Sequence, residues 1–305
     1  MSGKNVTEVL PAGPEGIAKA ARILESGGLV AVPTETVYGL AARADSAEAV
    51  ARIYAAKGRP DFNPLIVHVR GLEQAERHAA FSSVARALAL AHWPGPLTLV
   101  LPRRAGAGLA EAVTAGLPTV ALRAPAHPAM RALLEAVDFA LAAPSANRSG
   151  FISPTCVDHV LTSLDGRIDL VLDGGPTTAG VESTIVAVRD DGGVEELRPG
   201  PLQIASPTAS RAIEAPGQLA SHYAPGKPVR LGVTQAGADE FLIGFGPVAG
   251  DVTLSVSGDL DVAAARLYAC LHEAARAPHP RIAVAPVPEE GVGRAINDRL
   301  RRAAA

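Results

Sequence analysis

The sequence predicts an α/β fold, in which a twisted mixed sheet with flanking helices is followed by a second, smaller α/β unit. Segments with the apolar period of an α-helix alternate with short apolar runs that are typical of buried strands. This alternation fades in a Pro-, Ser- and Ala-rich stretch over 206–227, which indicates a linker, and then resumes. A chain of 305 residues is long enough for one large domain, or for a main domain and a small one.

Helices are predicted from apolar periodicity and from their end signals. Apolar residues recur at i, i+3, i+4 and i+7 within 14–26, and the glycines behind this segment supply its C-terminal stop. Ser46 can cap a second helix over 47–57, and Thr155 is expected to cap a later helix that ends near Leu164. The other helical segments are 82–92, 126–137, 261–277 and a final helix ending at Arg302.

Strands are predicted where short runs are rich in Val, Ile, Leu and Ala. The last two runs before the linker are expected to form a closing hairpin, with "DDGG" as its turn. The predicted strands are 29–32, 65–69, 97–101, 119–123, 139–143, 168–173, 183–188 and 194–197, followed beyond the linker by "VRLGV", "FLIGF" and "IAVAP".

The composition indicates a soluble cytoplasmic protein. Its net charge of -3 argues against binding nucleic acid through a broad basic field. The two cysteines lie far apart in the sequence, which suggests a reducing compartment. The N-terminal residues lack the apolar core of a signal peptide, and no apolar run reaches membrane-spanning length.

Several common functional motifs are absent. The sequence contains no G-x-x-x-x-G-K-[ST] phosphate loop, no H-E-x-x-H zinc motif and no G-x-S-x-G nucleophile elbow. The stretch "GFGPVA" over 244–249 matches a dinucleotide fingerprint, but the strand-like "DVTLSV" behind it does not form the helix that such a site requires. A dinucleotide site is therefore not expected there.

Four polar stretches lie where predicted strands end. In open α/β sheets ligands bind at strand ends, so these stretches are expected to converge on one cleft. They are "PTETVYG" (33–39), "KGRPDFNPL" (57–65), "PSANRSG" (144–150) and "GVESTIV" (180–186).

Lys57 and Arg59 flank a glycine just beyond a predicted helix. Cations at this position are favoured by the helix dipole alone, which is the structural interpretation. The functional interpretation is an anion clamp, in which an ammonium and a planar guanidinium hold a polyphosphate and Asn63 adds a fixed amide nearby.

The remaining polar stretches carry weaker signals. Ser145 and Asn147 would point the same way in an extended segment and could grip a phosphate or a sugar, although such a pair also commonly closes a turn. Arg123 could bind a carboxylate in bidentate fashion, or it could form a surface ion pair. His68 alternates with Ile66 in its strand, where a lone histidine is more often a core residue.

Taken in order, these stretches resemble the YrdC-like family, and within it the longer members, the threonylcarbamoyl-AMP synthases. The resemblance spans residues 30–225, about two-thirds of the chain. The matching pieces are "PTETVYGL", "KGRP", "NPLIVHV", "WPGPLTLVL", "TVALRAP", "APSANRSG", "SPT", "GVESTIV", "LRPG" and "HYAP".

The resemblance implies a nucleotidyltransferase that makes L-threonylcarbamoyl-adenylate and pyrophosphate from L-threonine, bicarbonate and ATP. Mg²⁺ would enter through the ATP phosphates, without a protein ligand. Downstream threonylcarbamoyl transferase machinery would then modify an adenosine beside the tRNA anticodon, so the chain itself needs no stable contact with nucleic acid. The implied fold is a YrdC-like twisted open mixed sheet over 7–205, a lid-forming linker over 206–228 and a small Rossmann-like domain over 229–305.

The resemblance also implies roles for individual residues, among which Lys57 and Arg59 would be catalytic because they neutralise developing charge. Tyr223 of "HYAP" would reach the nucleotide from the lid, and Thr119 could contact either ligand. The implied ATP-binding residues are Lys57, Arg59, Asn63, Thr119, Ser145, Asn147, Ser153, Arg198 and Tyr223, and the implied threonine-binding residues are Thr36, His68, Arg123, Ala143 and Ser183.

Two other functions remain open at this point. One is a non-enzymatic RNA-binding module of the same fold, against which the acidic charge balance and the scarcity of aromatics weigh. The other is a carbamoyl-adenylate-type transferase that uses an acceptor other than threonine.

Overall fold

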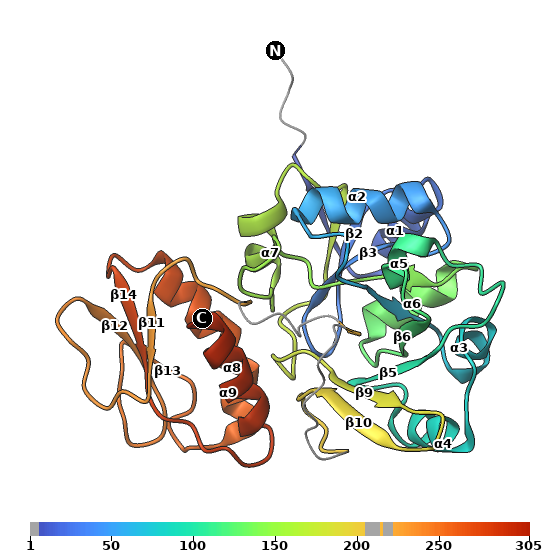
Figure 1. Ribbon diagram of the computed structural model, residues 1–305. Coiled ribbons are helices and arrows are strands. Elements are labelled where there is room, and N and C mark those ends of the chain that lie inside the picture. Colours follow the sequence, from blue (N-terminus) through green and yellow to red (C-terminus); the bar gives the residue numbers. More distant parts are fainter. Residues whose placement is uncertain (1–5, 205–213, 216–221) are drawn as a thin grey trace.

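The computed structural model describes residues 6–204, 214–215 and 222–305 (Figure 1). The described residues form a ten-stranded sheet and a separate four-stranded sheet, each with its own helices. The elements of the larger unit are β1 Glu8–Pro11, α1 Pro14–Glu25, β2 Val30–Pro33, β3 Tyr38–Arg43, α2 Ala47–Lys57, β4 Ile66–His68, α3 Leu72–His78, α4 Ser83–His92, β5 Leu97–Pro102, α5 Glu111–Thr114, β6 Thr119–Arg123, α6 Pro128–Ala136, β7 Leu141–Ala142, α7 Val157–Leu164, β8 Leu170–Asp173, β9 Thr184–Val188 and β10 Val194–Arg198.

The larger sheet is mixed, as the sequence predicts. Its strand order is β1-β8-β2-β3-β7-β4-β6-β5-β9-β10. β4 and β6 are parallel, β5 and β9 are parallel, and β3, β7 and β4 run antiparallel to one another in turn. The predicted closing hairpin is confirmed, because β9 and β10 pair antiparallel on either side of the "DDGG" turn.

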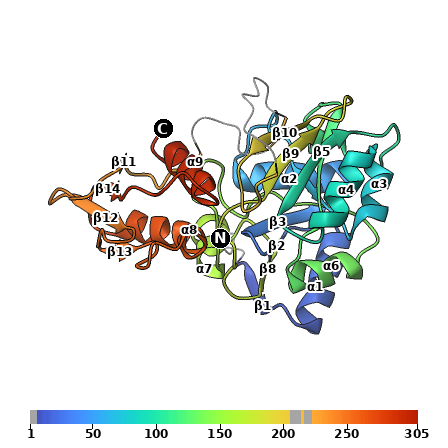
Figure 2. The ribbon, with the colours of Figure 1, turned by 90° about the horizontal axis from the view of Figure 1, so that it is seen from below.

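Alternating side chains of the strands enter two different cores. In β2, Ala31 packs into a core shared with α2, α4, α5 and α7, whereas Val30 and Val32 pack into the opposite core with α1 and α6. This alternation follows from the two-residue period of a strand. The two helical layers therefore cover opposite faces of the sheet (Figure 2).

The face of the sheet that α1 and α6 cover also carries a separate cluster, which is made by strand residues. Ile66, Ala121 and Ile185 contribute to it, and among the described residues no helical side chain does. Ala215 packs into the same cluster, so that part of the linker region lies over this face. The neighbouring Glu214 pairs with Arg189, with Oε2 lying 2.7 Å from the guanidinium. The candidate site lies on this part of the sheet.

The smaller unit has a wholly parallel sheet with the order β11-β14-β12-β13. Two helices lie between this sheet and the larger unit (Figures 1 and 2). The predicted strands and helices of this unit are confirmed. Its elements are β11 Val229–Leu231, β12 Glu240–Gly244, β13 Val252–Thr253, α8 Leu260–Arg276, β14 Arg281–Val284 and α9 Gly293–Ala303.

The two units share a core. Val37, Ile152 and Val181 of the larger unit pack in one cluster with side chains of α8 and α9. Gly180 has φ +71°, and a Cβ at this position would lie 2.3 Å from the carbonyl oxygen of Ala264 in α8. Glycine is therefore required at this point of contact between the units.

Some elements differ from the sequence-based expectations. β1, β3, α3 and α5 were not predicted, and β3 occupies part of a stretch that the sequence presented as a polar loop. Thr155 does not cap α7, because Cys156 is the N-cap residue and the Thr155 hydroxyl lies 3.2 Å from Nδ1 of His159. The strand expected behind "GFGPVA" is present, since β13 follows this stretch and the next helix begins only at Leu260.

Two further expectations can be compared with the described residues. None of their helices combines the length and apolar character needed to cross a membrane. Cys156 and Cys270 are both free thiols.

A stacked histidine pair joins the two units. The rings of His159 in α7 and His272 in α8 lie 3.8 Å apart and nearly parallel, and Nε2 of His272 lies 3.2 Å from the carbonyl oxygen of Ser153. Burial, followed by the charge of His159, lowers the pKa of His272 to about 3 from its ordinary value of 6.5. Burial likewise lowers the pKa of His159 to about 4, so both rings are neutral at neutral pH.

Acidification is expected to destabilise the protein through this pair. Below pH 6.5 the unfolded chain binds a proton at His272 that the folded chain does not bind until about pH 3, so stability falls as the pH drops through this window. At about pH 5.5 the loss from His272 amounts to about 1 kcal/mol. Urea unfolding of wild type and His272→Phe, each at neutral pH and at about pH 5.5, checks this. An equal loss of stability in the two proteins would contradict it.

Candidate active site

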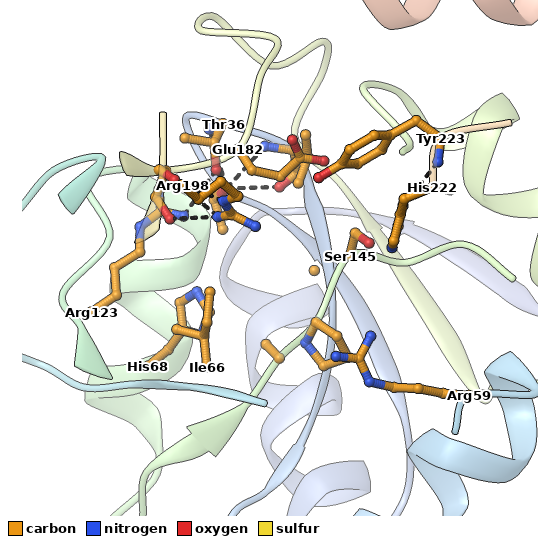
Figure 3. Close-up of a pocket in the computed structure, with 16 residues that line it drawn as sticks. Thr36, Arg59, Ile66, His68, Arg123, Ser145, Glu182, Arg198, His222 and Tyr223 are labelled. Carbon is orange, nitrogen blue, oxygen red and sulfur yellow. Dashed lines mark hydrogen bonds between the residues drawn. The ribbon is translucent and has the colours of Figure 1, made fainter. Parts of the chain in front are cut away.

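The four polar stretches do converge on one pocket over the strand cluster of the larger sheet (Figure 3), although 57–65 follows α2 rather than a strand and 180–183 precedes β9. Its walls come from β3, β4, β6 and β10, from the residues that precede β3 and β9, and from those that follow α2 and β7. Its described lining residues are Thr34, Thr36, Val37, Gly39, Arg59, Ile66, His68, Arg123, Ala143, Pro144, Ser145, Glu182, Ser183, Arg198, His222 and Tyr223.

Lys57 ends α2 and is buried. Its ammonium donates to the backbone carbonyl of Ser145 at 2.5 Å and to that of Asn147. Burial, with a smaller contribution from Arg59, holds the pKa of Lys57 well below its ordinary value. The ammonium thus fastens the loop after β7 to the end of α2, rather than simply interacting with the dipole of its own helix.

Arg59 is buried beside the same loop. Its Nε donates to the carbonyl oxygen of Asn63 at 3.1 Å, and one terminal nitrogen donates to that of Pro64 at 2.8 Å. Burial lowers the pKa of Arg59 to about 10. Within the described part of the chain, neither Lys57 nor Arg59 pairs with a carboxylate, although both are nearly inaccessible to water.

The side-chain amide of Asn63 is the clearest unsatisfied hydrogen-bonding group of the site. Its side chain is buried, and neither amide atom finds a hydrogen-bond partner among the described residues. Buried polar groups are normally hydrogen-bonded, so an unpaired amide beside two buried cations indicates a missing ligand.

Ser145 and Asn147 do not form the extended pair that their spacing suggested. Ser145 lines the pocket and bridges to Gly39, whereas Asn147 lies in a turn whose backbone N–H donates to the carbonyl oxygen of Ser145 at 3.0 Å. The Asn147 amide nitrogen donates within the loop, to the carbonyl oxygens of Arg148 and Phe151. Its side-chain oxygen has no partner among the described residues. Asn147 therefore shapes the loop that carries Ser145.

Arg123, at the end of β6, forms a buried fork rather than a surface ion pair. One terminal nitrogen donates to Thr36 Oγ1 at 2.9 Å, and the other to Glu35 Oε1 at 2.5 Å. The second oxygen of Glu35 accepts from the backbone N–H of Ala126 at 3.0 Å. Burial would raise the pKa of Glu35, but the adjacent Arg123 outweighs this effect and lowers it. Arg123 and Arg59 lie on opposite sides of the pocket (Figure 3).

His68 lines the pocket instead of the core. The register of β4 and β6 places it opposite Arg123, and the same face of β4 carries Ile66. Burial, followed by the charge of Arg123, lowers the pKa of His68 to about 3, so the ring is neutral at neutral pH. Its Nδ1 has no hydrogen-bond partner among the described residues.

Ser183, which directly precedes β9, is hydrogen-bonded to Arg198, the last residue of β10. Nε and one terminal nitrogen of Arg198 donate to the carbonyl oxygen of Ser183, at 3.1 and 2.9 Å, and the Ser183 hydroxyl accepts from the same terminal nitrogen at 3.0 Å. Thr98 Oγ1 lies 2.8 Å from that hydroxyl. Burial lowers the pKa of Arg198 from its ordinary value.

Glu182 is the only acidic side chain among the described lining residues. Ser153 Oγ donates to its Oε1 at 2.6 Å, Tyr268 donates to Oε2 at 2.8 Å, and Arg299 Nε donates to Oε2 at 3.0 Å. Burial would raise the pKa of Glu182, but the charges of Arg299 and Arg198 outweigh it and lower the pKa to about 2. The pocket thus contains an ionised carboxylate held partly by the smaller unit.

His222 and Tyr223 close one side of the pocket. Tyr223 adopts a left-handed backbone conformation with φ +64°, and its buried ring points across the pocket towards Glu182 (Figure 3). The Arg299 guanidinium carbon lies 5.6 Å from the centre of that ring. Burial lowers the pKa of His222 to about 3. Residues 206–213 and 216–221 of the predicted linker lie outside the described residues.

Most of the residues suggested by the sequence thus meet at the pocket, but some lie behind its wall. Lys57, Asn63, Asn147 and Ser153 contact the lining loops without lining the pocket. Thr119 begins β6, on the same face as Arg123 but four residues earlier, about 13 Å along the strand. The lining residues that the sequence did not suggest are Thr34, Val37, Gly39, Ile66, Pro144, Glu182 and His222, although each belongs to, or adjoins, one of the quoted motifs.

Comparisons with known proteins agree with the resemblance seen in the sequence. A family model described as "Telomere recombination" matches residues 22–200, and one described as "Threonylcarbamoyl-AMP synthase, C-terminal domain" matches residues 184–305. The chain is 39% identical to the threonylcarbamoyl-AMP synthase of Bacillus subtilis, over 98% of this chain and 96% of that protein. It is 37% identical to that of Pyrococcus abyssi, over 93% and 92%.

A solved structure extends this agreement to the arrangement of both units. The crystal structure of Pyrococcus abyssi Sua5 complexed with L-threonine matches with a TM-score of 0.87 and 35% identity, over 98% of this chain and 97% of that one. The mixed sheet and its cation-lined pocket define a protein of the YrdC-like α/β class. Because both family models match and the similarity covers nearly the whole chain, the chain belongs to the threonylcarbamoyl-AMP synthase family.

Proposed function

We propose that this chain joins L-threonine, bicarbonate and ATP into L-threonylcarbamoyl-adenylate, with release of pyrophosphate. The observation that carries the proposal is the juxtaposition of buried Lys57 and Arg59, unpaired with any described carboxylate, and the buried amide of Asn63 that lacks a described partner. Buried cations and an unsatisfied amide call for an anionic, hydrogen-bonding ligand, and a polyphosphate supplies both properties.

ATP binds on the side of the pocket that contains Arg59. Lys57, Arg59 and Asn63 hold the phosphates, with Asn147 supporting the loop around them. Ser145, Ser153, Thr119, Arg198 and Tyr223 complete the nucleotide site in the proposal. Mg²⁺ arrives as part of the MgATP substrate and needs no protein ligand. Among the described residues no cluster of His, Cys, Asp and Glu could hold a metal ion.

Threonine binds on the opposite side, around Arg123. The guanidinium already donates to oxygen atoms of Thr36, Glu35 and Gly95, so its orientation is fixed before a substrate carboxylate arrives. Ser183 and Thr36 offer hydroxyls to the substrate, and Ala143 leaves room for the threonine side chain. The neutral His68, with Nδ1 unpaired among the described residues, can hydrogen-bond the substrate without adding charge.

The chemistry requires no covalent enzyme intermediate. The neutral amine of threonine attacks the carbon of bicarbonate, water is lost, and a carbamate forms. A carbamate oxygen then attacks the α-phosphorus of ATP while the bond to the β-phosphate oxygen breaks, and pyrophosphate leaves with that electron pair. The enzyme contributes by aligning the reactants and by neutralising charge on the phosphates through Lys57 and Arg59.

The organisation and context of the chain belong to the same proposal. Residues 7–205 form the catalytic domain, 206–228 the linker and lid, and 229–305 the smaller domain. The product passes to downstream threonylcarbamoyl transferase machinery in the cytoplasm, which places the group on an adenosine next to the tRNA anticodon. The chain therefore needs no stable complex with nucleic acid.

Pyrophosphate release from MgATP and bicarbonate, measured with and without L-threonine, tests the proposal. Release that depends on threonine, and not on a panel of other amino acids, is the expected result. Release with a different acceptor would favour a carbamoyl-adenylate-type transferase. Salt-sensitive tRNA binding without any ATP turnover would favour an RNA-binding module.

A further inference from the structure

Glu182 presents an electrostatic problem for an anion-binding pocket. Its carboxylate lies in the pocket wall, next to Ser183, and is the only acidic group among the described lining residues. A charge of this kind, if uncompensated, would repel the phosphates of ATP in a site from which water is largely excluded. Ser153 and Tyr268 donate hydrogen bonds to it but carry no positive charge.

The larger part of the compensating charge comes from the smaller unit, and Arg198 of the pocket wall adds a smaller part. Arg299, in α9, is fully buried, and its Nε lies 3.0 Å from Glu182 Oε2. One terminal nitrogen donates at 2.7 Å to the carbonyl oxygen of Pro199, the residue that follows Arg198 of the pocket wall in the chain. The same guanidinium lies 5.6 Å from the ring centre of Tyr223. Arg299 therefore contacts the Glu182 loop, the Arg198 loop and the Tyr223 ring from one position.

We propose that Arg299 is a positioning residue for the adenylation reaction: it neutralises Glu182 in the pocket wall and thereby makes the pocket compatible with the ATP polyphosphate. The smaller unit thus contributes part of the electrostatics of the active site, in addition to packing against it. This inference rests on the proposed function for its substrate, but the effect of Arg299 on the charge of the pocket can be measured by ATP binding alone.

A second ion pair between the units provides a matched control. Arg294, also in α9, donates to Glu196 Oε1 at 2.5 Å, and the Glu196 side chain is 2% exposed. Glu196 does not line the pocket. Arg299→Met and Arg294→Met therefore make the same chemical change, and each leaves a buried carboxylate at the contact between the units. Only the first leaves that carboxylate facing the substrates.

The experiment compares wild type, Arg299→Met, Glu182→Gln, the double variant with both changes, and Arg294→Met. ATP affinity is measured by calorimetry, and the KM for ATP and kcat are measured by threonine-dependent pyrophosphate release. Arg299→Met is expected to weaken ATP binding and raise KM on the order of 10²-fold, with a smaller change in kcat, because the unpaired charge opposes the bound phosphates before and during reaction. Adding Glu182→Gln is expected to restore most of the affinity. Arg294→Met should leave it within about threefold of wild type, because the carboxylate that this change leaves unpaired, Glu196, does not line the pocket.

Several results would overturn the inference. Equal losses in Arg299→Met and Arg294→Met would mean that docking of the units, rather than charge in the pocket, is responsible. Failure of Glu182→Gln to restore ATP affinity in the double variant would have the same consequence. If Arg299→Met does not fold, Arg299→Lys is used, which keeps the charge and should retain ATP affinity within about tenfold while losing the bond to Pro199. The inference would be overturned if Arg299→Lys lost more ATP affinity than Arg294→Met and if adding Glu182→Gln did not restore that affinity.

The proposed function and this inference can fail separately. A wild-type protein that binds ATP but releases no pyrophosphate with threonine would contradict the proposed function. The ATP affinities of the same set of variants would still decide whether Arg299 neutralises Glu182.

Discussion

Lys57→Met is expected to lower kcat/KM for threonine-dependent pyrophosphate release by on the order of 10²–10³, comparable with removal of one oxyanion-stabilising donor. The Lys57 ammonium is buried and holds the loop of Ser145 and Asn147 through their backbone carbonyls. Its loss removes a positive charge from the side of the pocket where we propose that phosphates bind, and it also releases the loop. Steady-state kinetics with MgATP, bicarbonate and threonine measure the effect.

Lys19→Met is the matched control for this prediction. Lys19 lies on α1, where its half-exposed ammonium pairs with Glu8 at 2.6 Å, away from the pocket. Exposed pairs of this kind contribute little, so the control should keep wild-type kinetics. A folded Lys57→Met variant with a near-normal rate would mean that the buried ammonium has no part in catalysis.

Arg123→Lys is expected to raise the KM for threonine by on the order of 10²-fold while ATP affinity stays close to that of wild type. The guanidinium of Arg123 bonds Thr36 and Glu35 with different nitrogens and the Gly95 carbonyl with Nε, at 3.2 Å. A lysine has a single ammonium and cannot hold these groups and a substrate carboxylate in one geometry. Separate titrations with threonine and with ATP check the predicted split.

Arg131→Lys makes the same change on the exposed surface of α6. Arg131 is 37% exposed in its side chain and lies 4.0 Å from Glu135, so its replacement should alter neither substrate. If Arg123→Lys weakened ATP and threonine equally, or neither of them, Arg123 would not be the carboxylate-binding group of the threonine site.

The long periodic segments could be predicted from the sequence because each carries its own signals. α2 begins after Ser46, whose hydroxyl accepts from the N–H of Ala49, and ends before Gly58, which adopts the left-handed conformation expected of a C-terminal stop. β3 could not be predicted in the same way. Its stretch begins with Thr34, Glu35 and Thr36, which serve a turn and Arg123 rather than a strand pattern.

The candidate site could be predicted where short motifs bring its residues together, as in "KGRP" and "PSANRSG". The partner of Glu182 could not, because Arg299 lies 117 residues further along the chain. In the sequence "NDRLRRAAA", three arginines close to the end of the chain give no sign that one of them is buried. Only the packing of α9 against the larger unit separates Arg299 from its solvent-exposed neighbour Arg301.

The proposed reaction joins three substrates into one adenylate in this pocket. Mass spectrometry of the nucleotide product, after incubation with MgATP, L-threonine and ¹³C-bicarbonate, tests it most directly. We expect an adenylate that contains both the threonine and the ¹³C label, formed together with pyrophosphate. A labelled product without threonine, or AMP formed without incorporation of the label, would contradict it.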